Sequence, residues 1–208
     1  MSTAIIAKGS IAAKMALTAQ SFQDILMDLT AVVMVDTSGS MGARDVSAEG
    51  TISRFGQAIS HLQVLQEENP GKFLIFSFDN EVRMHLGGVP DDPDRSYDLR
   101  MTRMDLAVKA LFDFDGTGVR LFLLTDGEPS ASGMTSDEHQ SITLKMAAKF
   151  ETPIDVIHMG AQSDVLGITF CRKLAQASGG RFQKTTRPGD LMAPIKAALA
   201  LPAPKRGA

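Results

Sequence analysis

From residue 31 onward, short apolar runs alternate with segments of helical periodicity, and this alternation limits the folds open to the chain. Strands that alternate with helices of ten or more residues are typical of a mostly parallel sheet with helices on both faces. Only the residues DNE separate KFLIFSF from VRMHL, which is too short for a helical crossover, so one of these two strands should be antiparallel. In all, about six strands are predicted, in the runs AVVMV, KFLIFSF, VRMHL, VRLFLLT, IDVIHM and GRFQKT.

Helical periodicity also precedes the first strand. Apolar residues at spacings of three, four and seven predict an amphipathic helix over residues 11–29, and we expect its apolar face to pack on the same chain rather than on a partner. This divides the chain into an N-terminal extension over 1–30, one α/β domain over 31–200 and a flexible tail over 201–208. Within the domain, helices are predicted at residues 55–65, 103–112, 138–150, 165–177 and 189–199.

Composition excludes some classes of partner. Acidic residues outnumber basic ones by 24 to 21 in 208 residues, without a block of five like charges, so there is no electrostatic reason to expect nucleic acid or an anionic membrane. Lys8 and Lys14 interrupt the N-terminus, and no stretch approaches 18 apolar residues, which predicts neither export nor membrane spanning. A single cysteine, Cys171, lies in a helical pattern and is expected to be buried and inert. We expect a cytoplasmic protein.

The first strand ends in DTSGSMG, which places Asp36, Ser38 and Ser40 at alternate positions of one loop. A serine nucleophile elbow needs GxSxG, which neither serine satisfies. A dinucleotide loop needs GxGxxG and a phosphate loop needs GK[ST], and this stretch contains neither. Helix capping by the two hydroxyls is a poor alternative, because the next predicted helix starts more than ten residues later.

Other strands predict further oxygen donors for the same place. In an open, mostly parallel sheet, the loops at the carboxyl ends of different strands converge on one crevice. Asp126 follows the apolar strand LFLLT, and Thr102 stands where a loop gives way to a helix. Thr117 is a second threonine candidate, but it precedes the strand that ends at Asp126 and so belongs to the opposite edge. Two carboxylates and three hydroxyls suit Mg²⁺, Mn²⁺ or Ca²⁺ rather than zinc.

These residues carry a resemblance. Asp36, Ser38 and Ser40 as DxSxS, together with Thr102 and with Asp126 in TDG, resemble the metal-ion-dependent adhesion site (MIDAS) of a von Willebrand factor A (vWA) domain. The similarity extends to FSFDNEV and LLTDGEP and covers most of the chain beyond the N-terminal extension. It implies a Rossmann-like, doubly wound α/β fold.

The resemblance also implies how the site works. The two serines would coordinate a divalent ion, Mg²⁺ first, directly, Thr102 directly or through water, and the two aspartates largely through water. With few carboxylates around it, the ion keeps much of its charge and an open coordination position, which an acidic residue of a protein partner can fill. The segment between Ser40 and the first domain helix is longer than the usual family spacing, which raises the question whether Arg44 or Asp45 crowds the metal.

Two classes of function follow. The first is a stand-alone interaction module and not an enzyme, which by resemblance could serve a MoxR-type AAA+ ATPase or a tellurium-resistance or stress system. The alternative is a metal-assisted hydrolase, in which the ion lowers the pKa of a bound water. For that chemistry the sequence shows neither a positioned general base nor a substrate-orienting pair such as a histidine with its acid. Asp79 is expected to be a turn residue and His158 a structural one.

Overall fold

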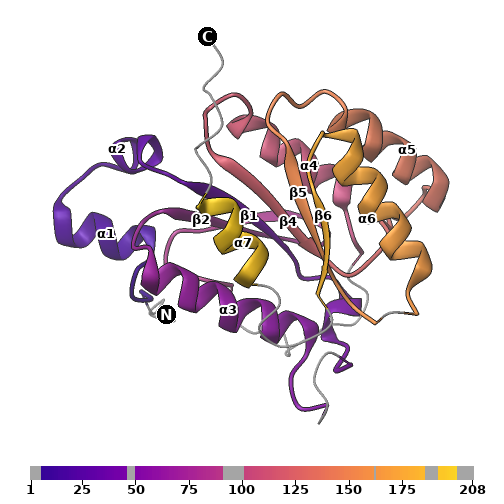
Figure 1. Cartoon of the computed structure of the whole chain (residues 1–208), viewed down its shortest axis with the longest axis horizontal. Coiled ribbons are helices and arrows are strands. Elements are labelled where there is room, and N and C mark those ends of the chain that lie inside the picture. Colours follow the sequence, from indigo (N-terminus) through magenta and orange to yellow (C-terminus); the bar gives the residue numbers. More distant parts are fainter. Residues whose placement is uncertain (1–5, 46–49, 91–100, 162, 186–191, 201–208) are drawn as a thin grey trace.

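The computed structural model describes residues 6–45, 50–90, 101–161, 163–185 and 192–200. They form one six-stranded sheet in the order β3-β2-β1-β4-β5-β6 (Figure 1). β3 is antiparallel to β2, and the other neighbours are parallel. The predicted α/β fold with one antiparallel strand is therefore confirmed. The strands are β1 (Ala31–Asp36), β2 (Phe73–Phe78), β3 (Val82–His85), β4 (Arg120–Thr125), β5 (Ile154–Met159) and β6 (Phe182–Thr185).

Helices cover both faces of the sheet. One face packs against α4, α5 and α6, and the other against α3 and α7, which lie next to each other (Figure 1). Within the domain the helices are α3 (Arg54–Glu68), α4 (Met104–Leu111), α5 (Ser136–Ala147), α6 (Val165–Ala177) and α7 (Met192–Leu199). Two 3₁₀ turns, η1 (Gly39–Gly42) and η2 (Phe112–Phe114), complete the domain.

Alternation along β1 explains why it is apolar throughout. Val32 and Met34 belong to the core under α4, α5 and α6, whereas Val33 and Val35 belong to the core under α3. All of these side chains are fully buried. A strand that is buried on both faces needs a continuous apolar run, and this is what the sequence AVVMV supplies.

The N-terminal extension differs from the prediction. Instead of one helix over 11–29, the structure has α1 (Ile11–Thr18) and α2 (Phe22–Met27). Ala19 adopts a left-handed conformation with φ 54°, which ends α1, and Ser21 starts α2 with a capping box that includes Asp24. Periodicity alone did not reveal this break.

Both short helices nevertheless pack on the domain. Ile11 and Ile25 are 1% and 0% exposed and join the core beneath α4. Gly9 lies so close to α3 that a Cβ atom there would sit 2.2 Å from the carbonyl oxygen of Gln66. The carbonyl of Gly9 also accepts a hydrogen bond of 2.8 Å from the Gly71 amide. A side chain at position 9 would push the extension off α3.

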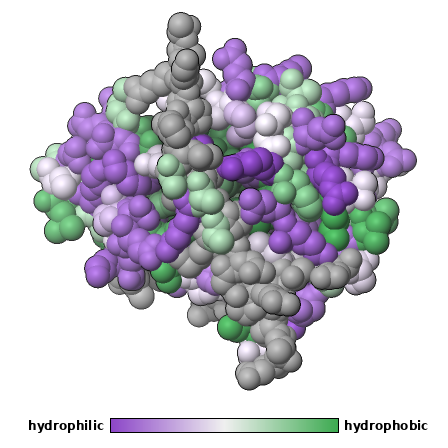
Figure 2. All heavy atoms as spheres, in the orientation of Figure 1, coloured by the Kyte–Doolittle hydropathy of each residue, from purple (hydrophilic) through white to green (hydrophobic). Residues whose placement is uncertain are grey.

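The visible surface in Figure 2 is mainly hydrophilic, with hydrophobic residues scattered between hydrophilic ones. Among the described helices, none is long and apolar enough to cross a membrane. The predicted tail over 201–208 lies outside the described residues.

Candidate metal centre

β1 and β4 are adjacent parallel strands, and their carboxyl ends deliver the two predicted aspartates to one edge of the sheet. Asp36 is the last residue of β1, and Asp126 follows Thr125 at the end of β4. The chain order along the sheet reverses between these strands, since β2 lies on one side of β1 and β4 on the other. Such a switch point is where open α/β sheets bind their ligands.

Four of the five predicted residues are connected by hydrogen bonds. The backbone amide of Ser38 donates to Asp36 Oδ1 at 2.8 Å, and the Oγ atoms of Ser38 and Ser40 lie 3.2 Å apart. The Ser40 hydroxyl in turn donates to Asp126 Oδ1 at 2.8 Å. The second oxygen of Asp36 accepts from Thr125 Oγ1 at 2.6 Å. The two loops therefore form one cluster of oxygen atoms.

The charges of the two aspartates are poorly solvated. Burial raises the pKa of Asp36 to about 7, and the nearby charge of Asp126 adds to this effect. Burial likewise raises the pKa of Asp126, although hydrogen bonds and the charge of Arg54 oppose the rise. A cation bound between these two carboxylates would stabilise their ionised forms.

Thr102 reaches this region through its backbone. Its amide donates to Ser130 Oγ at 2.9 Å, and its carbonyl accepts from the Ser130 amide at 3.0 Å. Ser130 belongs to the loop that begins with Asp126, so the segment before α4 is fixed against the loop after β4. Thr102 is buried, with an exposed fraction of 6%.

The hydroxyls lie nearer to a helical turn than predicted. η1 begins at Gly39, directly after Ser38, whereas the sequence placed the next helix more than ten residues away. Ser38 occupies the capping position of η1, but its side chain makes no capping hydrogen bond there. The buried side chain of Met41 anchors this turn in the core. The hydroxyl of Ser38 is thus left facing that of Ser40.

Arg54 was not predicted from the sequence. Its Nη1 donates to Asp126 Oδ2 at 2.6 Å, while its Nε and Nη2 donate to the two oxygens of Asp45 at 2.8 and 2.5 Å. An arginine at the start of a predicted helix ordinarily indicates an exposed residue, so the sequence carried no signal for this contact. Of Arg44 and Asp45, the two residues that could crowd the metal, Asp45 is paired with Arg54.

Two further polar residues have structural partners. The carboxylate of Asp79 accepts from the backbone amide of Glu81 at 3.2 Å, which confirms the predicted turn. His158 is fully buried, and its Nε2 lies 3.2 Å from Asp164 Oδ2, a partner that sequence reasoning missed. Burial lowers the pKa of His158, although Asp164 opposes the change.

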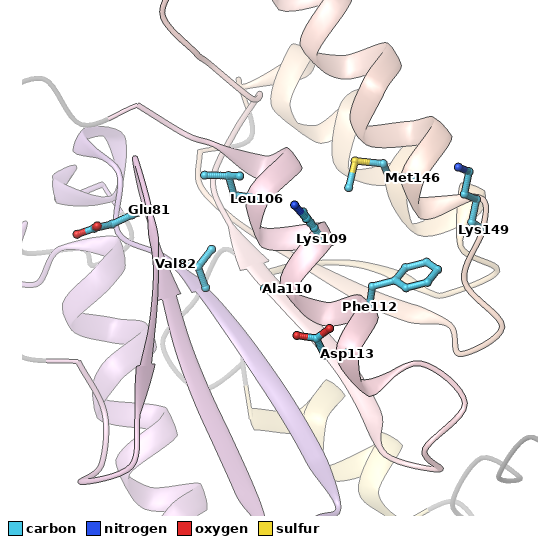
Figure 3. A pocket seen from close by; sticks show the side chains of 9 residues that line it. All are labelled: Glu81, Val82, Leu106, Lys109, Ala110, Phe112, Asp113, Met146 and Lys149. Atoms are coloured by element: carbon cyan, nitrogen blue, oxygen red, sulfur yellow. The ribbon is translucent and has the colours of Figure 1, made fainter.

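One groove on the described part of the protein does not include this cluster. It has a volume of about 580 Å³ and lies between the edge strand β3 and helices α4 and α5 (Figure 3). Apolar side chains such as Val82, Leu106 and Met146 line it, with Lys109 and Asp113 among its charged residues. Its mainly apolar lining lacks the grouped oxygen donors of the cluster beyond β1 and β4.

The donor set of the cluster fits a hard divalent ion. Within the described parts of the chain, no group of three or more His, Cys, Asp and Glu side chains could hold a metal. The cluster instead combines two carboxylates with serine hydroxyls, which suits ions that prefer oxygen and keep some of their water. Zinc, which favours nitrogen and sulfur ligands, is a poorer match.

Comparison with known proteins identifies the fold alone. No protein-family model matches the chain, and no curated protein matches it. Among solved structures, the conserved hypothetical protein BatB from Bacteroides thetaiotaomicron is similar, with a TM-score of 0.60 and 15% sequence identity. The match covers 83% of this chain and 98% of that chain. The arrangement of strands and helices is compatible with a vWA fold.

Proposed function

We propose that the protein is a vWA-type interaction module that binds an acidic residue of a protein partner through a divalent cation. The hydrogen-bonded cluster of Asp36, Ser38, Ser40 and Asp126 at the switch point of the sheet carries this proposal. Thr102 is proposed as the fifth ligand, in support of which its backbone is hydrogen-bonded to Ser130 in the loop after β4. The resident ion in this proposal is Mg²⁺, with Mn²⁺ or Ca²⁺ as substitutes.

The composition of the cluster supports binding of an anion. A bound ion would supply positive charge and an open coordination position. Serine hydroxyls are neutral ligands, so they hold an ion without cancelling its charge. The two buried aspartates carry at most two negative charges, and Arg54 already offsets one of them. A carboxylate of a partner would therefore be drawn to the open coordination position of the ion.

The class of partner is proposed from the family resemblance. A MoxR-type AAA+ ATPase, or a protein of a tellurium-resistance or stress system, would present an acidic side chain to the site. We propose no enzymatic activity. In support, His158 is fully buried, so its ring is withdrawn from the surface where a hydrolase would need a general base, although its pairing with Asp164 is an arrangement that the sequence did not reveal.

Metal binding is the first test. We expect calorimetric titration with Mg²⁺ to show binding to the full chain and none to an Asp36→Ala, Ser38→Ala double variant. A matched control is Asp137→Ala, Ser141→Ala, which removes the same two residue types from exposed positions on α5. Equal Mg²⁺ binding by all three proteins would show that the cluster is not the metal site.

Partner capture is the second test. The immobilised protein should retain an acidic partner in Mg²⁺ and release it in chelator, and the Asp36→Ala, Ser38→Ala variant should retain none. If the captured proteins are the same in Mg²⁺, in chelator and on the variant, the metal bridge is wrong. Turnover of a generic phosphoester or peptide that the variant lacks would favour the hydrolase instead.

A further inference from the structure

Arg54 occupies an unusual position for a cation. It is the first residue of α3, where the partial positive charge of a helix N-terminus disfavours a positive side chain. Its side chain is nevertheless only 11% exposed. A largely buried guanidinium at this place needs specific negative partners, and Arg54 has two of them.

The two partners lie on opposite edges of the guanidinium. Asp126 accepts from Nη1, and Asp45 accepts from both Nε and Nη2 in a bidentate pair. Asp45 follows β1 and η1, whereas Asp126 follows β4. Arg54 therefore joins the two loops that carry the candidate metal ligands.

A glycine leaves room for this guanidinium. Gly160 follows β5, and a Cβ atom built on it would lie 3.3 Å from Arg54 Cζ and 3.4 Å from Arg54 Nη1. Such distances are tight contacts, so a side chain at position 160 would press on the arginine. Loops after β1, β4 and β5 thus enclose Arg54 together.

The two oxygens of the Asp126 carboxylate have different hydrogen-bond donors. Its Oδ1 accepts from Ser40, which is a proposed metal ligand, and its Oδ2 accepts from Arg54. A divalent ion held by the serines would share the Asp126 carboxylate with the guanidinium of Arg54. The positive charge of this guanidinium would repel the ion. Both cations would sit among buried groups, where such repulsion is weakly screened.

We infer that Arg54 is a resident counter-cation that lowers the affinity of the site for divalent ions, and that Asp45 moderates this effect by pairing with it. The inference rests on the proposed metal site and adds a residue that sets its affinity. Without a metal, Arg54 compensates Asp126. With a metal, its charge adds to that of the ion, which strengthens the attraction for an acidic partner.

Two substitutions should shift metal affinity in opposite directions. Arg54→Gln removes the competing charge, and we expect it to bind Mg²⁺ and Mn²⁺ roughly tenfold more tightly than the unsubstituted chain. Asp45→Asn leaves the charge of Arg54 less compensated, and we expect weaker binding by a factor of roughly three to ten. Arg181→Gln is the control, because Arg181 pairs with Asp155 near the amino ends of β5 and β6, at the edge of the sheet opposite the cluster.

Calorimetric titration of the full-length proteins with Mg²⁺, and with Mn²⁺ as a second probe, measures these shifts. Thermal melting in chelator and in Mg²⁺ gives an independent readout. Arg54→Gln should lose stability in chelator, because Asp126 loses its partner, and should gain more from Mg²⁺ than the unsubstituted chain does. If Arg54→Gln does not fold in chelator, Asp45→Asn retains the Arg54–Asp126 pair and still carries the test.

The outcomes separate this inference from the proposed function. If the unsubstituted chain binds Mg²⁺ but Arg54→Gln binds it equally or more weakly, the inference is wrong and the metal site stands. The same holds if Asp45→Asn binds as tightly as the unsubstituted chain or more tightly. If no protein in the series binds Mg²⁺ or Mn²⁺, both the metal site and the role of Arg54 are refuted.

Discussion

At the scale of single residues, the hydroxyl of Thr125 is the contact that most directly supports Asp36. It donates to Asp36 Oδ2 at 2.6 Å inside the core, and both residues are fully buried. Thr125→Val keeps the shape but removes the donor, which leaves a buried oxygen without its partner. We expect the free energy of unfolding to fall by about 1–3 kcal/mol in chelator, measured by urea denaturation.

Thr143→Val is the matched control for that substitution. Thr143 is equally buried, but its hydroxyl donates to the carbonyl of His139 within α5, where the helix already satisfies the backbone. Its replacement should cost less. If the free energy of unfolding falls equally in the two variants, the hydrogen bond to Asp36 contributes no more to stability than the bond within α5.

Single residues also show where sequence reasoning succeeds and where it ends. Asp36, Ser38, Ser40 and Asp126 could be grouped because each follows an apolar strand, and parallel strands end at one edge. Arg54 could not be added, because nothing in its neighbourhood in the sequence marks a contact with a carboxylate 72 residues away. Its role depends on the path of the loop after η1, which has no periodic pattern.

At the scale of elements, Asp105 links α4 to α5 and makes stability depend on pH. Burial opposes the ionisation of Asp105, but hydrogen bonds from Arg103 and His139 outweigh it and lower its pKa to about 2. The two bonds from Arg103 are 2.8 Å long, and His139 Nε2 lies 2.7 Å from the carboxylate. A carboxyl whose pKa falls on folding stabilises the native state above its unfolded pKa of about 4.

We therefore expect this contribution to be complete at neutral pH and to disappear as the pH falls from about 4 to about 2. Asp105→Asn should lower the free energy of unfolding at pH 7 and flatten its dependence on pH in that interval. Urea denaturation at a series of pH values measures both effects. Asp137→Asn, on the exposed side of α5, is the control. An unchanged acid profile for Asp105→Asn would contradict the assignment.

The N-terminal helices provide a second test at this scale. Ile25 of α2 is fully buried in the core, whereas Leu17 of α1 is 86% exposed. Ile25→Ala should lower the free energy of unfolding by about 2–5 kcal/mol through loss of burial and the cavity left behind. Leu17→Ala should change it little, as surface substitutions do. Similar small values for both, from chemical denaturation, would show that the extension does not contribute to the folded core.

Elements differ in how far the sequence predicts them. The strands β1, β2, β4 and β5 could be predicted because each is a compact, mainly apolar run between turn residues, whereas the edge strands β3 and β6 are short and more polar. The break between α1 and α2 was missed, since apolar spacing continues through it and only the cap at Ser21 marks a new start. η1 was missed because four residues, Gly39–Gly42, are too few to show a period.

At the scale of the whole molecule, one sheet both builds the core and positions the cluster. β1 lies at its centre, with β2 on one side and β4 on the other. The sequence predicted the strands but not their order, because apolar runs of similar composition do not specify their neighbours. The order places the loops after β1 and β4 side by side, and the two layers of helices keep that arrangement rigid.

Because the domain encloses its single cysteine, the thiol of Cys171 reports on opening of the whole fold. Cys171 lies on α6 in the core, and burial raises the pKa of its thiol well above the usual range. We expect a thiol reagent to react only with open molecules, at a rate proportional to their population. Mg²⁺ bound to the native state should slow labelling by the factor 1 + [Mg²⁺]/Kd, which is roughly a hundredfold at 100 times the Kd.

The control is the double variant Asp36→Ala, Ser38→Ala, which should be labelled at the same rate in Mg²⁺ and in chelator. Rapid labelling of the unsubstituted chain under native conditions would mean that the core around α6 opens locally, without the rest of the sheet.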